Sequence, residues 1–163
     1  MQARSATGLG SAVRLRTVEP RDLPTLFQYQ LDPDANRMSL TRPRDAESFR
    51  LVWEKIFADP SVVAQAIVID DVVVGSIGSF QVDGLDSVGY LIAREHWGKG
   101  IASRALALFL ELVTVRPLHA TVASSNLASL RVLHKCGFTI TGTRLAPETD
   151  RYLACEEVSL VLA

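Results

Sequence analysis

The chain has 163 residues, with 17 Lys and Arg against 18 Asp and Glu, a formal net charge of −1 and 48% apolar residues. A domain usually has about 100–200 residues, so this length predicts one domain, and the apolar content excludes an intrinsically disordered chain. A protein dedicated to nucleic acid normally carries a basic excess, which this composition lacks, so we expect no nucleic-acid partner.

The first part of the chain predicts a tail, a strand and two helices. Residues 1–10 lack the apolar stretch of a signal peptide and are expected to form a mobile tail ahead of a domain over 11–163. Apolar and polar side chains alternate over 12–18, as in a half-buried strand. Helical spacing follows over 23–31, and Asp32-Pro33-Asp34 is expected to end that helix because proline cannot continue it. A second helix is predicted over 45–58, capped by Asp45, with one apolar face: Phe49, Trp53, Ile56 and Phe57.

The middle of the chain predicts a hairpin and a strand that leads into a helix. Residues 62–69 and 72–80 are rich in Val and Ile, and Asp70-Asp71 between them indicates a turn joining antiparallel strands. The same acids interrupt the longest apolar region, so no run reaches the ~18 residues of a membrane span and no membrane partner is expected. A strand over 87–93 then precedes a helix over 101–115, whose expected core face is Ile101, Ala105, Leu108, Phe109 and Leu112.

The last part of the chain predicts alternating strands and one helix. The strands are expected over 119–123, 138–143 and 152–162, and the helix over about 126–135, closed by Gly137. Antiparallel strands early and a strand-helix-strand-helix unit late predict an α+β fold with helices on the faces of a sheet.

The segment from Gly98 to Ser103 is a candidate anion site. A strand delivers the chain to a turn with two glycines, and the helix that follows has no acidic residue in its first two turns. A helix N-terminus presents unpaired N–H groups and the positive end of the helix dipole, which favour an anion. Lys99 and Arg104 add positive charge. The alternative is a strand-to-helix turn that merely uses glycine.

Three phosphate-binding patterns compete for this turn. A P-loop needs Gly-Lys followed by Ser or Thr, whereas Lys99 is followed by Gly100-Ile101. The dinucleotide pattern Gly-x-Gly-x-x-Gly is nearly matched by Gly98, Gly100 and Ser103, but no acid lies about 20 residues further on. The third pattern is an acyl-CoA loop.

Several segments together resemble the GNAT superfamily of N-acetyltransferases. Gly100-Ile101-Ala102 match the end of the family's cofactor loop, and Trp97 replaces its first residue, as in the branch that resembles ribosomal-protein N-terminal acetyltransferases. Asn126 and Gly137 have the spacing of that branch. The similarity covers most of 12–163, including Arg14-Leu15-Arg16, Glu19-Pro20-Arg21-Asp22, Asp32-Pro33-Asp34, Gly89-Tyr90-Leu91-Ile92-Ala93, Asn126-Leu127-Ala128-Ser129 and Lys135-Cys136-Gly137-Phe138.

The resemblance implies a mixed, mostly antiparallel central sheet flanked by helices, with acetyl-CoA in a V-shaped cleft between the strand that ends at Ala93 and the strand over 119–123. Backbone groups of Leu91, Ile92 and Ala93 would hold the pantetheine arm and polarise the thioester carbonyl. The amides of the turn would hold the pyrophosphate, and the implied cofactor-binding residues there are Trp97, Gly98, Lys99, Gly100, Ile101, Ala102 and Ser103. Fixed N–H donors stabilise the negative charge that develops on the carbonyl oxygen under attack by an amine.

Two polar residues of the helix over 126–135 have both a structural and a functional interpretation. Asn126 fits a helix N-cap, and the resemblance also implies that it bonds the cofactor arm. Ser129 lies one turn later on the same helix face. By resemblance Ser129 would protonate the leaving thiolate, since the family's usual Tyr is replaced here by Leu133; the alternative is a hydroxyl that bonds a backbone carbonyl.

Glu148 lies where the ribosomal-protein branch carries a proposed general base. An exposed loop acid without a task is the alternative, because glutamate is common on surfaces. The further candidate bases are Asp83, Asp86, Glu156 and Glu157.

Together these residues predict an N-acetyltransferase that transfers acetyl from acetyl-CoA to a primary amine by direct attack in a ternary complex. The amine would be a protein N-terminus or a small molecule; the alternative function is a non-catalytic CoA-binding sensor or assembly module. The three histidines lack metal-ligand spacing, so no metal is expected. The two cysteines form no disulfide framework, which predicts a cytoplasmic location. The resemblance also implies a homodimer.

Overall fold

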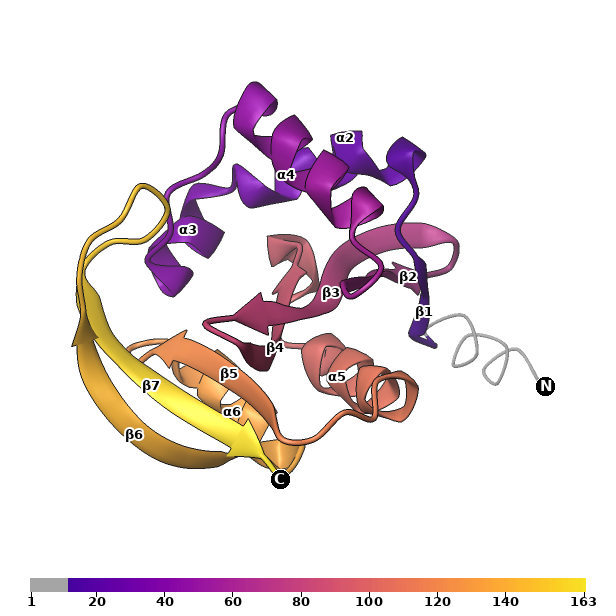
Figure 1. Ribbon diagram of the computed structural model, residues 1–163. Helices are drawn as coiled ribbons and strands as arrows, with labels where there is room; N and C mark the ends of the chain where they lie inside the picture. The colour runs from indigo at the N-terminus through magenta and orange to yellow at the C-terminus, as the bar shows by residue number, and fades with distance from the viewer. Residues whose placement is uncertain (1–11) are drawn as a thin grey trace.

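The computed structural model describes residues 12–163, so the tail expected over 1–10 lies outside the described residues. In this part of the chain seven strands form one sheet in the order β1-β2-β3-β4-β5-β7-β6, with helices against both faces (Figure 1). All neighbouring strands are antiparallel except β4 and β5. The strands are β1 (Arg14–Thr17), β2 (Val63–Ile69), β3 (Val72–Val82), β4 (Leu85–Ile92), β5 (Leu118–Ala123), β6 (Thr139–Ala146) and β7 (Cys155–Leu162). The predicted α+β architecture is confirmed.

The helices on one face of the sheet come from the N-terminal third of the described chain. They are the 3₁₀ turn η1 (Pro20–Asp22), α2 (Leu23–Gln30), α3 (Pro33–Ser39) and α4 (Ala46–Ala58). Asp45 caps α4 as predicted, because its Oδ1 accepts a hydrogen bond from the Ser48 amide at 2.8 Å. The sequence analysis missed α3. Asp32 not only ends α2 but also caps α3, and Pro33 occupies the first helical position, where a missing N–H breaks no helical hydrogen bond.

Tight backbone turns set the two hairpins that build the middle of the sheet. Asp70 and Asp71 both adopt positive φ, 51° and 63°, which matches the twist of β2 and β3 and confirms the predicted hairpin. Further along β3, a Cβ on Gly75 would lie 2.1 Å from the Leu91 carbonyl oxygen of β4. Glycine is therefore required where β3 and β4 approach each other.

The junction of β4 and β5 opens the sheet. The two strands are in register at Ser87 and His119 only, and past this pair β4 runs on to Ile92 and β5 to Ala123 without further pairing. β5 instead pairs with β7 along its whole length. Because no further pair joins these strands, their facing backbone edges are unpaired toward the C-terminal ends, where the sequence analysis predicts a V-shaped cleft.

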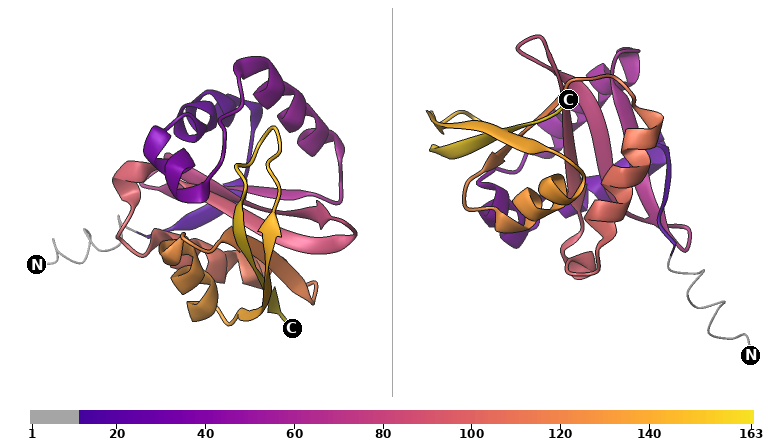
Figure 2. Two further views of the ribbon diagram at one scale, coloured as in Figure 1. Left: turned by 90° about the vertical axis from the view of Figure 1, so that its left-hand side faces the viewer. Right: turned by 90° about the horizontal axis from the view of Figure 1, so that it is seen from below.

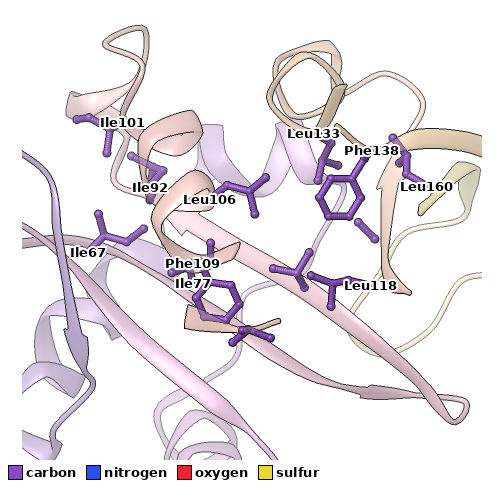
Figure 3. Packing of buried hydrophobic residues seen from close by; sticks show 14 of the residues in the cluster. Ile67, Ile77, Ile92, Ile101, Leu106, Phe109, Leu118, Leu133, Phe138 and Leu160 are labelled. Atoms are coloured by element: carbon purple, nitrogen blue, oxygen red, sulfur yellow. The ribbon is translucent and has the colours of Figure 1, made fainter. Parts of the chain in front are cut away.

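Two helices follow β4 and β5 and cover the other face. β4 leads through η2 (Arg94–His96) to α5 (Ile101–Leu112), and β5 leads to α6 (Leu127–Lys135). Their apolar side chains pack with the sheet in the larger core cluster, in which Phe109, Leu106 and Phe138 are almost fully buried (Figure 3). The smaller cluster lies under α2 and α4 around Leu26 and Trp53.

Two apolar residues predicted to face the core are exposed. Leu112 is 55% exposed, because α5 ends there rather than at residue 115 and Val113 turns inward in its place. Phe57 is 44% exposed at the end of α4, where its ring packs 5.7 Å from that of Trp53.

The β6–β7 loop reaches across to the α3–α4 connection (Figure 2). Thr41 and Tyr152 form an isolated antiparallel bridge, and the Arg42 amide donates to the Arg151 carbonyl oxygen at 2.7 Å. The buried Gln30 side chain fixes the α3–α4 connection by bonding both the amide and the carbonyl of Arg44. Two loops more than a hundred residues apart in sequence are thus joined through their backbones. No helix within 12–163 has the length and apolar character to cross a membrane.

Candidate active site

The turn before α5 has the geometry of an anion-binding helix start. Gly98 and Gly100 adopt φ of 76° and 74°, which L side chains rarely do, and Gly100 is the N-cap of α5. The first intrahelical hydrogen bond runs from the Arg104 amide to the Gly100 carbonyl oxygen. The amides of Ile101, Ala102 and Ser103 therefore have no partner within the helix. No acidic side chain lies in this first turn.

A groove of about 590 Å³ continues from this turn along α5 to the C-terminal end of α6. It contains three cationic side chains and no acidic one, although the whole chain carries a net charge of −1. A Cβ built on Gly100 would meet no atom within 4 Å, so the space beside the turn is open. The groove therefore suits an extended anion, and its lining residues are Lys99, Gly100, Ser103, Arg104, Ala107, Leu110, Lys135 and Cys136.

The end of β4 is held by hydrogen bonds to its neighbours. The Ala93 amide donates to the Val74 carbonyl oxygen at 2.8 Å, and the Trp97 indole Nε1 donates to the Ile92 carbonyl oxygen at 2.9 Å. Since partner residues of an antiparallel ladder alternate in direction, the Ile92 amide faces the opposite edge of β4, toward the opening. Of the backbone groups predicted around Leu91, Ile92 and Ala93, the Ile92 N–H is thus the donor that faces the opening.

Asn126 is a helix cap, as one of its two interpretations required. Its Oδ1 accepts a hydrogen bond from the Ser129 amide at 3.2 Å, and the side chain is 8% exposed. Its amide nitrogen Nδ2 donates to no group of residues 12–163. The cap therefore leaves the Nδ2 group of Asn126, with its two N–H donors, available at the start of α6.

Ser129 lies on the first turn of α6 and meets a residue of β4. Its Oγ lies 2.6 Å from Tyr90 Oη, and within the described chain it bonds no backbone carbonyl, which was the structural interpretation of this hydroxyl. Leu133, where the family usually has Tyr, is a 2% exposed core residue (Figure 3). Burial raises the pKa of Tyr90 to about 12, so its phenol stays protonated in neutral solution.

The sequence analysis included Tyr90 in a motif but assigned it no role. No local signal reveals the Tyr90–Ser129 contact, because it depends on how β4 and α6 approach one another.

Glu148 lies apart from these hydroxyls, in the β6–β7 loop. Its carboxylate accepts a hydrogen bond from the Arg42 guanidinium, which also donates to the Thr149 carbonyl oxygen at 2.6 Å. The other candidate bases are on strands or turns: Asp83 at the β3–β4 turn, Asp86 bonded to Gln81 at 2.7 Å, Glu156 on β7 and Glu157 bonded to Arg144 at 3.0 Å. None of these acids has a hydrogen bond to Ser129 or Tyr90.

Within residues 12–163 no three His, Cys, Asp or Glu side chains gather as metal ligands would. Cys136 instead borders the groove, and its thiol lies 3.7 Å from the Ser103 carbonyl oxygen. Burial raises the pKa of the Cys136 thiol, which opposes formation of a reactive thiolate.

Solved structures share this fold. A spermidine N-acetyltransferase from Vibrio cholerae, in complex with CoA and spermine, superposes with a TM-score of 0.76 over 91% of this chain and 95% of that chain, at 17% identity. RimJ of Mycobacterium smegmatis, in complex with CoA-disulfide, superposes with a TM-score of 0.76 over 94% of this chain and 82% of that chain, at 23% identity.

The sequence comparisons reach beyond the fold. The uncharacterised N-acetyltransferase p20 of Bacillus licheniformis is 30% identical over 142 residues, 78% of this chain and 79% of that protein. The family model described as acetyltransferase (GNAT) domain matches residues 12–139. The chain therefore belongs to the GNAT family of N-acetyltransferases.

Proposed function

We propose that this GNAT enzyme binds acetyl-CoA in the cationic groove and transfers its acetyl group to a primary amine by direct attack in a ternary complex. The observation that carries the proposal is the cationic groove at the start of α5, where unpaired helix amides lie beside three cationic side chains and no acidic one. The Ile92 amide and the Ser129 hydroxyl are proposed to contact the same cofactor further along. Acetyl-CoA supplies an activated acyl group and a thiol leaving group. The residues of the chain bind it, orient it and move the protons.

The groove fits the diphosphate end of the cofactor. The amides of Ile101, Ala102 and Ser103, presented by Gly98 and Gly100, would donate to the pyrophosphate oxygens. The charge of the pyrophosphate, and that of the phosphate on the ribose of CoA, would be neutralised by Lys99, Arg104 and Lys135. Trp97 would contribute to cofactor binding indirectly, because its indole donates to the Ile92 carbonyl oxygen and so fixes the end of β4.

The pantetheine arm is proposed to lie between the unpaired edges of β4 and β5. The Ile92 N–H would donate to the thioester carbonyl oxygen, where negative charge develops, and Leu91 would flank the arm. Ala93, whose amide is engaged with Val74, sets the position of that donor. The spare Nδ2 of Asn126 would donate to a carbonyl of the arm.

Ser129 and Glu148 are proposed to move the protons. Ser129 would donate its hydroxyl hydrogen to the leaving sulfur. Glu148 would accept the proton of the amine, directly or through water, for which it must share its carboxylate between Arg42 and the substrate. Asp83 and Asp86 are the next candidates for the base.

The acceptor is proposed to be a protein N-terminus, as in the ribosomal-protein branch, or a small amine. Among the similar structures, one is a spermidine N-acetyltransferase in complex with spermine, which supports a small amine. The paired loops around Arg42 and Glu148 are proposed to lie on the acceptor side of the cofactor and to select the amine.

A thiol-release screen tests this function. The chain is given acetyl-CoA with a panel of peptides bearing free N-termini, polyamines, amino sugars and amino acids, and free CoA is measured. We expect release with one class of amine, above the rate without amine. CoA binding without release for any amine would favour the non-catalytic sensor or assembly module instead.

A further inference from the structure

Tyr90 and Ser129 bring two hydroxyl groups together at the edge of the opening. Tyr90 lies on β4, two residues before the Ile92 amide that faces the opening, and Ser129 lies on the first turn of α6. Their oxygen atoms are 2.6 Å apart. Within the described residues, the Ser129 side chain forms no other hydrogen bond. Whatever Ser129 does to the leaving sulfur, it does while bonded to Tyr90.

The direction of this hydrogen bond decides what Ser129 can do. A hydroxyl has one hydrogen and two acceptor lone pairs, so Ser129 can donate to a ligand only if it does not donate to Tyr90. A phenol is a far stronger acid than an alkyl alcohol and is therefore the better donor. The phenol of Tyr90 also keeps its proton, because burial raises its pKa to about 12. A thiolate at Cys136 would raise the pKa of Tyr90 further, but the Cys136 thiol is itself neutral because burial raises its pKa.

We infer that Tyr90 is a positioning residue for the acyl transfer: its phenol donates to Ser129 Oγ and turns the single Ser129 hydrogen toward the sulfur of the leaving group. The inference rests on the role proposed for Ser129. As the C–S bond breaks, its electron pair stays on sulfur and takes the Ser129 hydrogen, while the Tyr90 hydrogen bond stabilises the negative charge that grows on Ser129 Oγ. The amine loses one proton to Glu148, Glu148 releases it to water, and water reprotonates Ser129. One proton thus leaves the amine and one reaches the sulfur, and every residue regains its starting protonation state.

The kinetic test compares Tyr90→Phe, Ser129→Ala and the double variant. Tyr90→Phe keeps the ring and removes only the hydroxyl, so we expect kcat to fall about tenfold or less, with the KM for acetyl-CoA unchanged. In the Ser129→Ala background the same substitution should have no further effect, because the two hydroxyls act as one unit. The matched control is Tyr29→Phe, which removes a phenol that donates to the Val73 carbonyl oxygen at 2.7 Å and should leave kcat unchanged.

A second readout needs no turnover. The thiol of bound CoA can be titrated by the ultraviolet absorbance of its thiolate. A hydrogen bond from Ser129 lowers the pKa of that thiol, so we expect the pKa to rise in Tyr90→Phe, and to rise in Ser129→Ala by at least as much. The double variant should match Ser129→Ala, and Tyr29→Phe should match the unchanged protein.

The outcomes separate this inference from the proposed function. If Ser129→Ala changes kcat and the thiol pKa while Tyr90→Phe changes neither, Ser129 keeps its role and the inference about Tyr90 is wrong. If Ser129→Ala changes neither quantity, the proposed role of Ser129 fails and the inference with it. Effects that simply add in the double variant would also refute it, because they indicate two independent structural roles.

Discussion

Gly100→Asp tests the assignment of the anion site most directly. The chain offers a matched control in Gly84→Asp: Gly84 lies at the β3–β4 turn with φ of 79°, Gly100 caps α5 with φ of 74°, and an added Cβ meets no atom within 4 Å at either position. Both substitutions change the net charge equally, and both place a side chain in the left-handed region, at about 1–2 kcal/mol each. Only Gly100 borders the cationic groove.

The expected loss of CoA affinity follows from the charges. A carboxylate at position 100 would lie within about 5 Å of a pyrophosphate held by the first amides of α5. In water, two unit charges at that distance repel by about 0.8 kcal/mol, so two phosphate charges give about 1.6 kcal/mol before any steric contact is counted. Since about 1.4 kcal/mol is tenfold, CoA should bind at least tenfold more weakly to Gly100→Asp.

Isothermal calorimetry with CoA provides the measurement, with far-ultraviolet circular dichroism and a thermal melt to establish that both variants fold. We expect similar melting temperatures for the two variants and a loss of affinity in Gly100→Asp alone. Unchanged affinity in a folded Gly100→Asp protein would place the cofactor elsewhere. An equal loss in Gly84→Asp would show that net charge or stability, rather than the turn, explains the result.

Two further predictions concern charged side chains. Asp22 is 5% exposed and accepts two hydrogen bonds of 2.8 Å from Arg16, whose guanidinium holds the pKa of that carboxyl below its usual value. Asp22→Asn should therefore lower the free energy of unfolding at pH 7 by about 2–3 kcal/mol. Because the pKa of Asp22 is lowered in the folded state, its carboxylate stabilises the fold above the ordinary pKa of 3.8, and the difference between the two proteins should shrink as the pH falls below that value. Denaturant titrations at several pH values would measure this difference. Glu148→Gln should lower kcat by up to ~10²–10⁴-fold at low pH, where the amine is charged, and the loss should shrink as the pH rises. A Glu148→Gln enzyme with wild-type kcat over the whole pH profile would remove Glu148 from the mechanism and direct attention to Asp83 or Asp86.

Local signals in the sequence predict much of the fold. Asp45 and Asn126 cap helices because short polar side chains satisfy nearby amides, and Asp70-Asp71 forms a turn because aspartate tolerates positive φ. Gly98 and Gly100 likewise predict a turn before α5, because glycine adopts positive φ without steric cost. The analysis missed α3, since Pro33 has the same local signature whether it follows one helix or starts another.

The arrangement of the candidate site is less predictable. The contact of Tyr90 with Ser129 and the ion pair of Arg42 with Glu148 join residues 39 and 106 positions apart. Such contacts follow from tertiary packing rather than from hydrophobic periodicity or capping. The family motif identified Ser129 and Glu148 as candidates, but their partners emerge only when the strands and loops are placed in space.

The single register pair between β4 and β5 puts the proposed cofactor cleft at the least paired junction of the sheet. Among the described strands, Ser87 and His119 form the one register pair between the β1–β4 half and the β5–β7 half, and the Thr41–Tyr152 bridge joins only the loops. A ligand that bonds the free edge of β4 and also the start of α6 would bridge that seam. Loading with CoA should then slow amide hydrogen exchange across both halves at once, since a bound ligand stabilises every element whose opening would release it. The cofactor would thus act as an extra piece of the fold, joining two halves of the sheet whose described strands share a single register pair.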